Sequence, residues 1–314
     1  MSEKERIICV CGPTASGKSA LGIVLALDLG GEVISCDSMQ VYRGMDIGTA
    51  KPGPAEIAVV PHHMIDVADP FEDYSAARYA EEAASCITGV ISRGKLPIVV
   101  GGTGLYFDAL IKGGDYAPKP DPAVREELSA LARTRGGEYL FSMLKEQDPQ
   151  SAARLHVNDT KRIIRALEVK IATGITLSEH NERSRSIPPR YEAVMIGLDF
   201  EHREALYDRI NRRVDEMFAR GLVGEVASLI RSGVSDSCTA MQAIGYKETA
   251  AYLRGECTLD GAVEAVKLAT RRYAKRQLTW FRRYGRMKWI IQPDTPDPDE
   301  VRRLSTQYAL SSEI

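Results

Sequence analysis

An eight-residue segment, Gly12-Pro13-Thr14-Ala15-Ser16-Gly17-Lys18-Ser19, constrains the fold of this 314-residue chain more than any other feature. It matches the pattern G-x-x-x-x-G-K-[ST] at every defined position. The apolar run Ile7–Cys11 before it predicts a buried strand, and the apolar stretch Ala20–Leu29 after it predicts a helix. In that context the segment, called the phosphate loop below, predicts backbone N–H groups and a helix N-terminus that bind phosphate oxygens.

All eight residues of the phosphate loop are therefore candidate diphosphate-binding residues. Lys18 would neutralise phosphate charge, and the Ser19 hydroxyl is the candidate ligand for Mg²⁺. The loop indicates a diphosphate or triphosphate but not what that group is attached to. Three functions stay open on this ground: a nucleotide-driven machine, a kinase that moves a γ-phosphoryl group, and a transferase whose leaving group is pyrophosphate.

Strands and helices alternate along much of the chain, which predicts a parallel α/β sheet. Further strands are expected at Val33–Cys36, Pro97–Val100, Tyr191–Leu198 and Lys288–Ile291. Further helices are expected from the Asp73-Tyr74-Ser75 cap to about Ser92 and at about 202–220, 222–232 and 259–284. The tail from Pro293 is rich in turn residues and is expected to be peripheral.

Turn-forming residues interrupt this alternation at Asp115, Pro118, Pro120 and Pro122. Helical patterns then follow at Ala123–Arg135, Glu138–Glu146 and Lys161–Ala172, and Ile187-Pro188-Pro189 closes the stretch. We therefore predict a mainly helical insertion domain over residues 116–189. The core would comprise residues 1–115 and 190–314.

The composition excludes several classes of protein. Hydrophobic residues make up 44% and charged residues 27% of the chain, which excludes disorder, collagen and a disulfide scaffold. The six cysteines form no C-x-x-C pair, the five histidines have no zinc-ligand spacing, and no apolar stretch is long enough to span a membrane. We expect a cytoplasmic protein with free cysteines, no membrane partner and a monomeric state.

The net charge is −2, from 41 basic and 43 acidic residues, but the charge is segregated. The segment 267–288, called the basic segment below, holds nine basic residues, four interleaved aromatic residues and no acid. Such a segment in a near-neutral protein favours a polyanionic partner such as nucleic acid. The alternative is a solvated helix face beside acidic neighbours.

Two polar residues follow predicted strands directly or closely. Asp37 follows Val33–Cys36, and Thr103 follows Pro97–Val100, so both are expected at the carboxyl edge of the sheet beside the phosphate loop. Asp37 could act as a general base or hold Mg²⁺ through water, and Thr103 could bind a substrate amine. The alternatives are a turn or helix cap for Asp37 and a turn hydroxyl for Thr103.

Six segments together resemble the tRNA dimethylallyltransferase family, also called tRNA isopentenyltransferases, in its bacterial form. In family order these segments are Gly12–Ser19, Asp37–Pro52, Gly101–Tyr106, Arg162–Val169, Ala243–Glu248 and Thr270–Phe281. The phosphate loop is shared by many families, whereas Asp37–Pro52 is far more specific. The C-terminal part has no Cys/His set of the kind that forms a zinc finger in eukaryotic relatives.

The resemblance implies a P-loop NTPase-like parallel sheet flanked by helices, with the helical insertion domain contacting the anticodon stem-loop of tRNA. It implies Mg²⁺-assisted transfer of a dimethylallyl group from dimethylallyl diphosphate to N6 of the adenosine 3′-adjacent to the anticodon, in tRNAs reading codons that begin with U, with release of pyrophosphate. Asp37 would be the general base, and Thr103 would position the amine. A buried site also requires the base to be extruded from the anticodon loop.

The resemblance further assigns a set of tRNA-binding residues. They are Asp37, Ser38, Met39, Gln40, Thr103, Arg125, Lys161, Arg162, Ile163, Ile164, Arg165, Gln242, Ala243, Ile244, Gly245, Tyr246, Lys247, Lys275, Arg276, Gln277, Trp280 and Arg282. Part of the basic segment, Trp280 and Phe281 above all, is expected to pack in the core instead.

Three rival functions remain beside this one. An enzyme acting on free adenine nucleotide, as plant-type relatives do, would need neither the insertion nor the basic segment. A P-loop kinase of small metabolites would turn over ATP, but the sequence has no evident Arg-rich lid near the first strands. A non-catalytic RNA-binding module would leave Asp37 and Lys18 without a role.

Overall fold

The computed structural model describes residues 4–113, 117 and 121–311. The chain divides into two compact units, each described here by itself. One unit comprises the residues up to Ile111 and those from Arg190 onward, and the other is Lys112–Pro189. Three of the turn residues that mark the start of the predicted insertion, Asp115, Pro118 and Pro120, lie outside the described residues.

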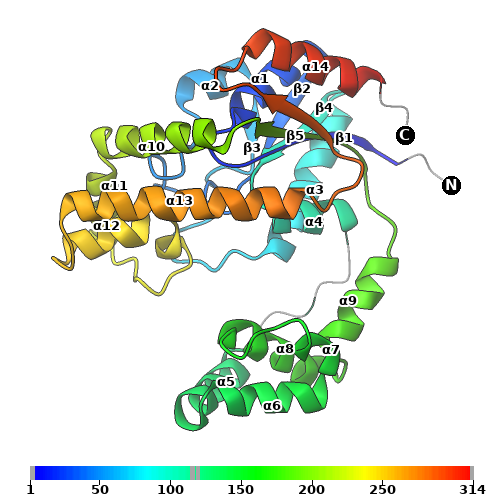
Figure 1. The fold of residues 1–314 in the computed structure, drawn as a ribbon. Helices are drawn as coiled ribbons and strands as arrows, with labels where there is room; N and C mark the ends of the chain where they lie inside the picture. The colour runs from blue at the N-terminus through cyan, green and yellow to red at the C-terminus, as the bar shows by residue number, and fades with distance from the viewer. Residues whose placement is uncertain (1–3, 114–116, 118–120, 312–314) are drawn as a thin grey trace. The chain divides into compact units, whose positions relative to one another are not determined.

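The larger unit is built on a sheet whose six strands, in the part of the chain described, are all parallel (Figure 1). The strands are β1 (Arg6–Cys11), β2 (Gly31–Cys36), β3 (His62–His63), β4 (Leu96–Gly101), β5 (Glu192–Phe200) and β6 (Lys288–Gln292). Their order is β3-β2-β4-β1-β5-β6, which places β1 between β4 and β5. This confirms the predicted parallel α/β sheet. The ends of the five predicted strands agree with the observed ones to within two residues, and the two-residue strand β3 was not predicted.

Helices cover both faces of this sheet. They are α1 (Lys18–Leu29), α2 (Pro54–Val59), α3 (Ala76–Ser92), α4 (Gly104–Lys112), α10 (Arg203–Ala219), α11 (Leu222–Arg231), α12 (Tyr246–Leu253), α13 (Leu259–Phe281) and α14 (Pro298–Ser311), with a 3₁₀ turn at Ala240–Gln242. The expected cap of α3 is present, because the Ser75 hydroxyl accepts a hydrogen bond from the Arg78 N–H.

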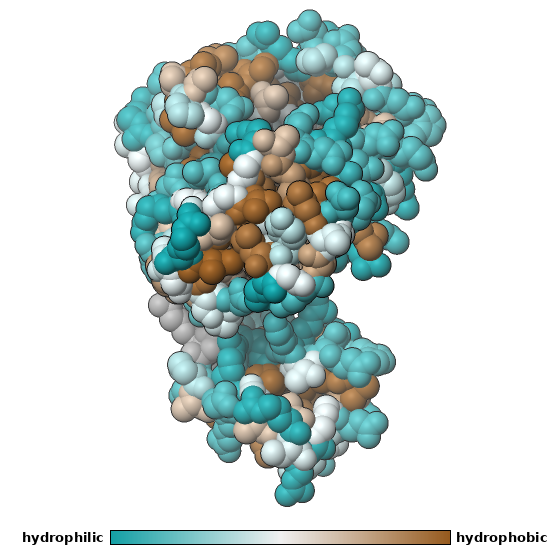
Figure 2. Space-filling model, turned by 90° about the vertical axis from the view of Figure 1, so that its left-hand side faces the viewer, coloured by the Kyte–Doolittle hydropathy of each residue, from teal (hydrophilic) through white to brown (hydrophobic). Residues whose placement is uncertain are grey.

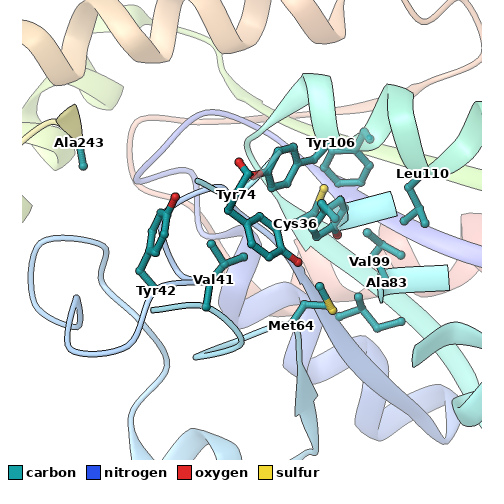
Figure 3. Packing of buried hydrophobic residues seen from close by; sticks show 14 of the residues in the cluster. Cys36, Val41, Tyr42, Met64, Tyr74, Ala83, Val99, Tyr106, Leu110 and Ala243 are labelled. Carbon is teal, nitrogen blue, oxygen red and sulfur yellow. The ribbon is translucent and has the colours of Figure 1, made fainter. Parts of the chain in front are cut away.

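Alternate residues of β1 feed two separate hydrophobic cores, as the two-residue period of a strand requires. Ile8 and Val10 pack in a core with α1 and α14, whereas Cys9 and Cys11 pack in a core with α3, α4, α12 and the end of α13. Figure 3 shows part of this second core, where Tyr106 of α4 lies beside Cys36 at the end of β2. This core supports the loops that follow β2 and β4.

The prediction of a turn-rich, peripheral tail after Pro293 is wrong. Residues Pro298–Ser311 form α14, and Val301 and Ala309 on one of its faces are buried against the first core. The overlooked signal is local. Asp297 precedes the proline at the first helical position, and its carboxylate accepts hydrogen bonds from the N–H groups of Asp299 and Glu300.

The smaller unit is helical in its described residues. Its helices are α5 (Pro122–Arg135), α6 (Gly137–Gln147), α7 (Pro149–Ala152), α8 (Thr160–Thr173) and α9 (Leu177–Ser186). Leu128, Leu140, Leu144, Ile163 and Leu167 form its own hydrophobic core. None of the helices described in either unit combines the length and the apolar character needed to cross a bilayer.

Candidate active site

The phosphate loop connects the end of β1 to the start of α1, at the carboxyl edge of the sheet. Gly17 has a φ of 92°, in the left-handed region that favours glycine. At Gly12 a Cβ atom would lie 3.0 Å from the backbone oxygen of Leu198 on β5 and 2.9 Å from Ser16 Oγ, so only glycine fits between the two strands. Both glycines of the motif are thus required by geometry.

Side chains hold the backbone of the phosphate loop at four consecutive positions. The bonds are Lys18 Nζ to Pro13 O at 3.1 Å, Gln277 Oε1 to Thr14 N at 2.9 Å, Arg209 Nε to Ala15 O at 2.9 Å and Gln292 Nε2 to Ser16 O at 3.0 Å. The donors and the acceptor come from α1, α10, α13 and β6. The loop is therefore held in shape by elements distant in sequence.

Two cations at this loop, Lys18 and Arg213, make no ion pair among the residues described, although the Asp37 charge acts on both. Burial first, and then the neighbouring Arg213 charge, lower the pKa of Lys18 to about 8, while Asp37 acts in the opposite direction. Burial also lowers the pKa of Arg213, whose buried Nε has no hydrogen-bond partner among the described residues. An anion placed between these cations would stabilise both charged forms, so the site is suited to a phosphate group.

Two cavities meet at Lys18, Ser19 and Arg213. One, called the Asp37 cavity below, measures about 300 Å³ and is also lined by Asp37. The other, called the arginine cavity below, measures about 350 Å³; its further lining includes Arg209 and Arg212. The arginine cavity also contains Glu216, so the phosphate-binding groups lie where two cavities adjoin that each contain a carboxylate.

Beyond the phosphate loop, apolar and polar residues together line the Asp37 cavity. The apolar lining residues include Ile210, Val214, Met217, Ala243, Ile244 and Val266, and the polar ones include Gln40, Gln242 and Arg276. On the surface, Figure 2 shows hydrophobic residues gathered in the middle of one face of the larger unit, with hydrophilic residues around them. A cavity that adjoins phosphate-binding groups and also offers apolar lining residues can accept a ligand that joins a phosphate to a hydrocarbon group.

Asp37 directly follows β2, and one of its carboxylate oxygens closes a turn. Oδ1 accepts hydrogen bonds from Met39 N at 2.9 Å and from Gln40 N at 3.4 Å. The turn-cap alternative is therefore realised, and the same residue lines the Asp37 cavity. The two interpretations of Asp37 are compatible, because a carboxylate has acceptor capacity beyond one such turn.

Thr103 lies after β4, and its hydroxyl does not serve a turn of its own backbone. Instead Oγ1 accepts a hydrogen bond from Ser38 N at 3.1 Å, which ties Thr103 to the turn that holds Asp37. The structure thus brings together Asp37, Thr103 and Ser38. This is the arrangement expected where neighbouring parallel strands end at one edge.

The segment Gly101-Gly102-Thr103-Gly104, called the GGTG loop below, packs against helix α13, and this packing requires glycine at two of its positions. A Cβ atom on Gly102 would lie 2.1 Å from Gln277 Nε2, and one on Gly104 would lie 2.1 Å from the Trp280 ring. Between them, Thr103 lies close enough to the Tyr273 hydroxyl to lower its pKa, against the larger effect of burial. Residues 273, 277 and 280 share one face of the helix, so this face packs against the loop residue by residue.

Tyr273 is a site residue that the sequence did not single out. Its side chain lines the Asp37 cavity, and burial first and the Asp37 charge second raise the pKa of its hydroxyl to about 12. The hydroxyl therefore stays protonated at neutral pH. The sequence analysis also missed Arg209 and Arg213, because α10 contains no motif that indicates a contact with the phosphate loop.

Several residues assigned to RNA are committed to protein contacts in the larger unit. The Gln40 amide bonds Ser35 Oγ at 2.8 Å and the carbonyls of Thr49 and Ala50 at 3.3 Å. Gln242 Nε2 bonds Asp236 O at 2.6 Å, and Arg282 bonds Asp199 at 2.9 Å. By contrast, Lys247, Lys275 and Arg276 are exposed, while Ser38, Met39, Ile244 and Trp280 are half-buried.

Tyr246, Gly245 and Ala243 are buried and act in the fold of a neighbouring loop. The Tyr246 hydroxyl donates to Glu225 at 2.6 Å, and the same carboxylate accepts hydrogen bonds from the N–H groups of Asp46, Ile47 and Gly48. A Cβ atom on Gly48 would lie 2.4 Å from the Tyr246 ring. The segments Asp37–Pro52 and Ala243–Glu248 are therefore partners in packing.

The remaining candidates lie in the smaller unit. Arg125 makes two bonds to Glu168, at 2.6 and 2.9 Å, and Arg165 approaches the same buried carboxylate at 3.5 Å. Ile163 and Ile164 are buried in that unit's core, whereas Lys161 and Arg162 are exposed. Within this unit the two isoleucines pack in the core and Lys161 and Arg162 are free to meet solvent.

No cluster of three or more His, Cys, Asp or Glu side chains suited to a metal occurs among the residues described. Ser19 is exposed at the start of α1 and lines both cavities, so its hydroxyl is available to a hard cation. Mg²⁺ commonly binds through few protein oxygens, with phosphate oxygens and water completing its shell. The donor set therefore fits Mg²⁺ only in company with a bound phosphate group.

Comparison with known proteins agrees with this geometry. The family model described as IPP transferase matches residues 40–284, and the one described as isopentenyl transferase matches residues 5–68. A tRNA dimethylallyltransferase of Geobacter sulfurreducens is 52% identical over 290 residues, covering 92% of this chain and 93% of the relative.

Two solved structures are similar over most of the chain. The tRNA isopentenylpyrophosphate transferase of Bacillus halodurans is 44% identical with a TM-score of 0.73, covering 98% of this chain and 96% of its own. A eukaryotic dimethylallyltransferase described as acting on tRNA is 30% identical with a TM-score of 0.81, covering 98% of this chain and 78% of its own.

Proposed function

The chain belongs to the tRNA dimethylallyltransferase family and is thus a transferase; from this premise we propose how its site carries out the reaction. It moves a dimethylallyl group from dimethylallyl diphosphate to N6 of the adenosine 3′-adjacent to the anticodon, in tRNAs reading codons that begin with U. The observation that supports this most is that Lys18, Ser19 and Arg213 lie where the arginine cavity meets the Asp37 cavity.

The diphosphate binds at the phosphate loop, Gly12–Ser19. Lys18 and Arg213 flank it, and burial lowers the pKa of both side chains against the opposing charge of Asp37. Loop N–H groups and the N-terminus of α1 add further positive potential. All of these groups favour the pyrophosphate that develops as the bond between carbon and oxygen breaks, so they lower the barrier to departure.

The adenine amine is alkylated in the Asp37 cavity. The N6 lone pair forms the new bond to C1 of the dimethylallyl group, the electrons of the C1–O bond pass to the diphosphate oxygen, and Asp37 accepts the N6 proton. Thr103, held by the Ser38 N–H and close to Tyr273, positions the amine. Because the amine is a poor nucleophile, a positioned base contributes about 10²–10⁴-fold.

Mg²⁺ is the proposed metal, with Ser19 as its protein ligand. When bound, it would add positive charge next to the departing pyrophosphate. The exposed hydroxyl of Ser19 at the start of α1 supports this assignment.

The proposed tRNA-binding residues differ in how exposed their side chains are and in whether they already have partners in the protein. Lys161, Arg162, Lys247, Lys275 and Arg276 are exposed and suited to phosphate oxygens. Arg125, Arg165 and Arg282 would first have to share or release their carboxylate partners. The buried residues of the set would act by shaping the loops rather than by touching RNA. The cytoplasmic location and the monomeric state stay predictions.

The test is an incubation of the purified chain with Mg²⁺, labelled dimethylallyl diphosphate and unmodified tRNA, with AMP as the acceptor in a parallel reaction. Mass spectrometry of nuclease fragments is expected to place one C5 unit on the adenosine 3′ of the anticodon. Modification of AMP in preference to tRNA would favour the free-nucleotide function. Phosphoryl transfer from ATP without prenylation would favour a kinase.

A further inference from the structure

We propose that Gln277 is a positioning residue that couples the phosphate loop to the GGTG loop, rather than a residue that contacts RNA. This inference rests on the proposed function for its kinetic test. In the proposed function the two loops hold different substrates. The phosphate loop binds the diphosphate, and the GGTG loop carries Thr103 beside the adenine amine.

The side chain of Gln277 is 5% exposed, although its neighbours Lys275 and Arg276 are exposed. Its amide uses both of its ends. Oε1 accepts a hydrogen bond from Thr14 N in the phosphate loop, and Nε2 donates one to Gly102 O in the GGTG loop, each at 2.9 Å. A single planar group thus spans the two loops, and these two bonds hold it in place in the wall of the Asp37 cavity.

The GGTG loop is shaped to receive this amide. A Cβ atom on Gly102 would lie 2.1 Å from Gln277 Nε2, so any side chain there would displace the amide. Gln277 and Thr103 both act on the pKa of Tyr273, so the three side chains lie close together. Movement of Gln277 would therefore reach Thr103 through the backbone of Gly102, the residue that precedes it.

Only an amide satisfies both bonds. Thr14 N needs an acceptor and Gly102 O needs a donor, and a carboxylate supplies acceptors only. Gln277→Glu keeps the size of the side chain and the bond to Thr14 but places an oxygen against the Gly102 carbonyl. Gln277→Met keeps approximate volume and loses both bonds.

Gln292 offers a matched comparison, because it is 4% exposed and holds the phosphate loop alone, through Nε2 to Ser16 O at 3.0 Å. If fixing the phosphate loop were all that Gln277 does, both residues would have the same effect. Gln277 differs in linking that loop to the acceptor side. A coupling residue should affect the geometry of attack, and a displacement of about 1 Å costs on the order of 100-fold in rate.

The experiment measures single-turnover rate, KM for dimethylallyl diphosphate and Kd for tRNA in Gln277→Glu, Gln277→Met and Gln292→Met, with Gln307→Met on the exposed side of α14 as control. Gln277→Glu keeps the bond to Thr14 N and is expected to lose about 10- to 100-fold in rate, with KM and Kd changed less than about threefold. Gln277→Met also frees the phosphate loop, so it is expected to lose as much in rate and to raise KM for the diphosphate as well, with Kd for tRNA changed less than about threefold. Gln292→Met is expected to raise KM for the diphosphate. Gln307→Met should match the wild type.

Amide hydrogen exchange supplies a second readout that needs no activity. In Gln277→Met, peptides containing Thr14 and peptides containing Gly102–Thr103 should both exchange faster, while in Gln292→Met only the former should. Weakened tRNA binding at unchanged rate would overturn the inference and return Gln277 to the RNA-binding set. So would unchanged exchange of the GGTG loop. An inactive wild type would instead overturn the proposed function, and the exchange pattern would still decide whether the link exists.

Discussion

Lys18 is the residue whose chemistry depends most on its surroundings. Burial and the nearby Arg213 lower its pKa to about 8, so it is charged below that pH and loses its proton as the pH rises through it. Diphosphate binding favours the charged form. We therefore expect kcat/KM for dimethylallyl diphosphate to fall as the pH rises above about 8.

Lys18→Met separates this effect from other titrations. The variant should show a lower kcat/KM at pH 7 and no further loss from this group between about pH 7.5 and 9. The measurement is a pH profile of initial rates at limiting diphosphate with saturating tRNA. A wild-type profile that stays flat well above pH 8 would remove Lys18 from the diphosphate site.

Asp37 has a structural and a proposed chemical role that one substitution can separate. Asp37→Asn retains Oδ1 as acceptor for Met39 N, so the turn persists, but it removes the base. We expect turnover to fall at least about 100-fold with little change in tRNA affinity. Asp37→Ala removes both the turn acceptor and the base. The difference in free energy of unfolding between the two variants therefore measures the contribution of the turn to stability. Equal losses of rate and affinity in Asp37→Asn would count against Asp37 as the base.

At the scale of elements, α14 is predicted to be a stability element. Val301 is 9% exposed and packs in the core that contains α1, and Arg302 makes two bonds to Asp28 of α1 at 2.8 and 2.5 Å. Val301→Asp buries an unpaired charge and should lower the free energy of unfolding by about 3 kcal/mol or more. Urea unfolding measures it, with the exposed Arg303→Ala as control, expected within about 0.5 kcal/mol of the wild type.

The elements that follow from local pattern were predictable. Buried runs marked β1, β2 and β4, and apolar periodicity marked α5, α6 and α8 to within two residues. Two helices that follow glycine-containing turns were missed, α4 at Gly104 and α12 after Gly245, because these glycines resemble turns. A contact between residues distant in sequence requires glycine here, as where the Trp280 ring packs against Gly104. A short stretch of sequence cannot reveal such a contact.

The site residues likewise fall into those that a local pattern could predict and those that depend on long-range packing. Asp37, Thr103 and the phosphate loop could be placed because strand ends of a parallel sheet converge. Arg209, Arg213, Tyr273 and the true contacts of Gln277 could not, because they come from α10 and α13. Their register against the sheet depends on long-range packing rather than on sequence spacing.

At the scale of the whole molecule, the basic segment is expected to contribute to tRNA binding unevenly. Lys267 is 15% exposed and paired with Asp215 at 2.8 Å and Glu264 at 3.1 Å, whereas Lys275 is exposed without an acidic partner in the structure described. Lys275→Gln should therefore weaken tRNA binding and reduce the slope of log K against log salt by up to about one.

Lys267→Gln is the matched control, since its charge is already compensated and its loss should change the slope less. Binding titrations over a range of salt concentrations give both slopes. A tRNA affinity that does not depend on salt in the wild type would argue against the basic segment as the footprint of RNA.

The meeting of two cavities at Lys18, Ser19 and Arg213 has a consequence for turnover. If the leaving pyrophosphate departs through the arginine cavity while the alkylated nucleobase withdraws through the other, neither product needs to wait for the other's exit. An enzyme with one exit path for both products would have to release them in a fixed order. Two cavities that share only three lining side chains allow the products to leave in either order.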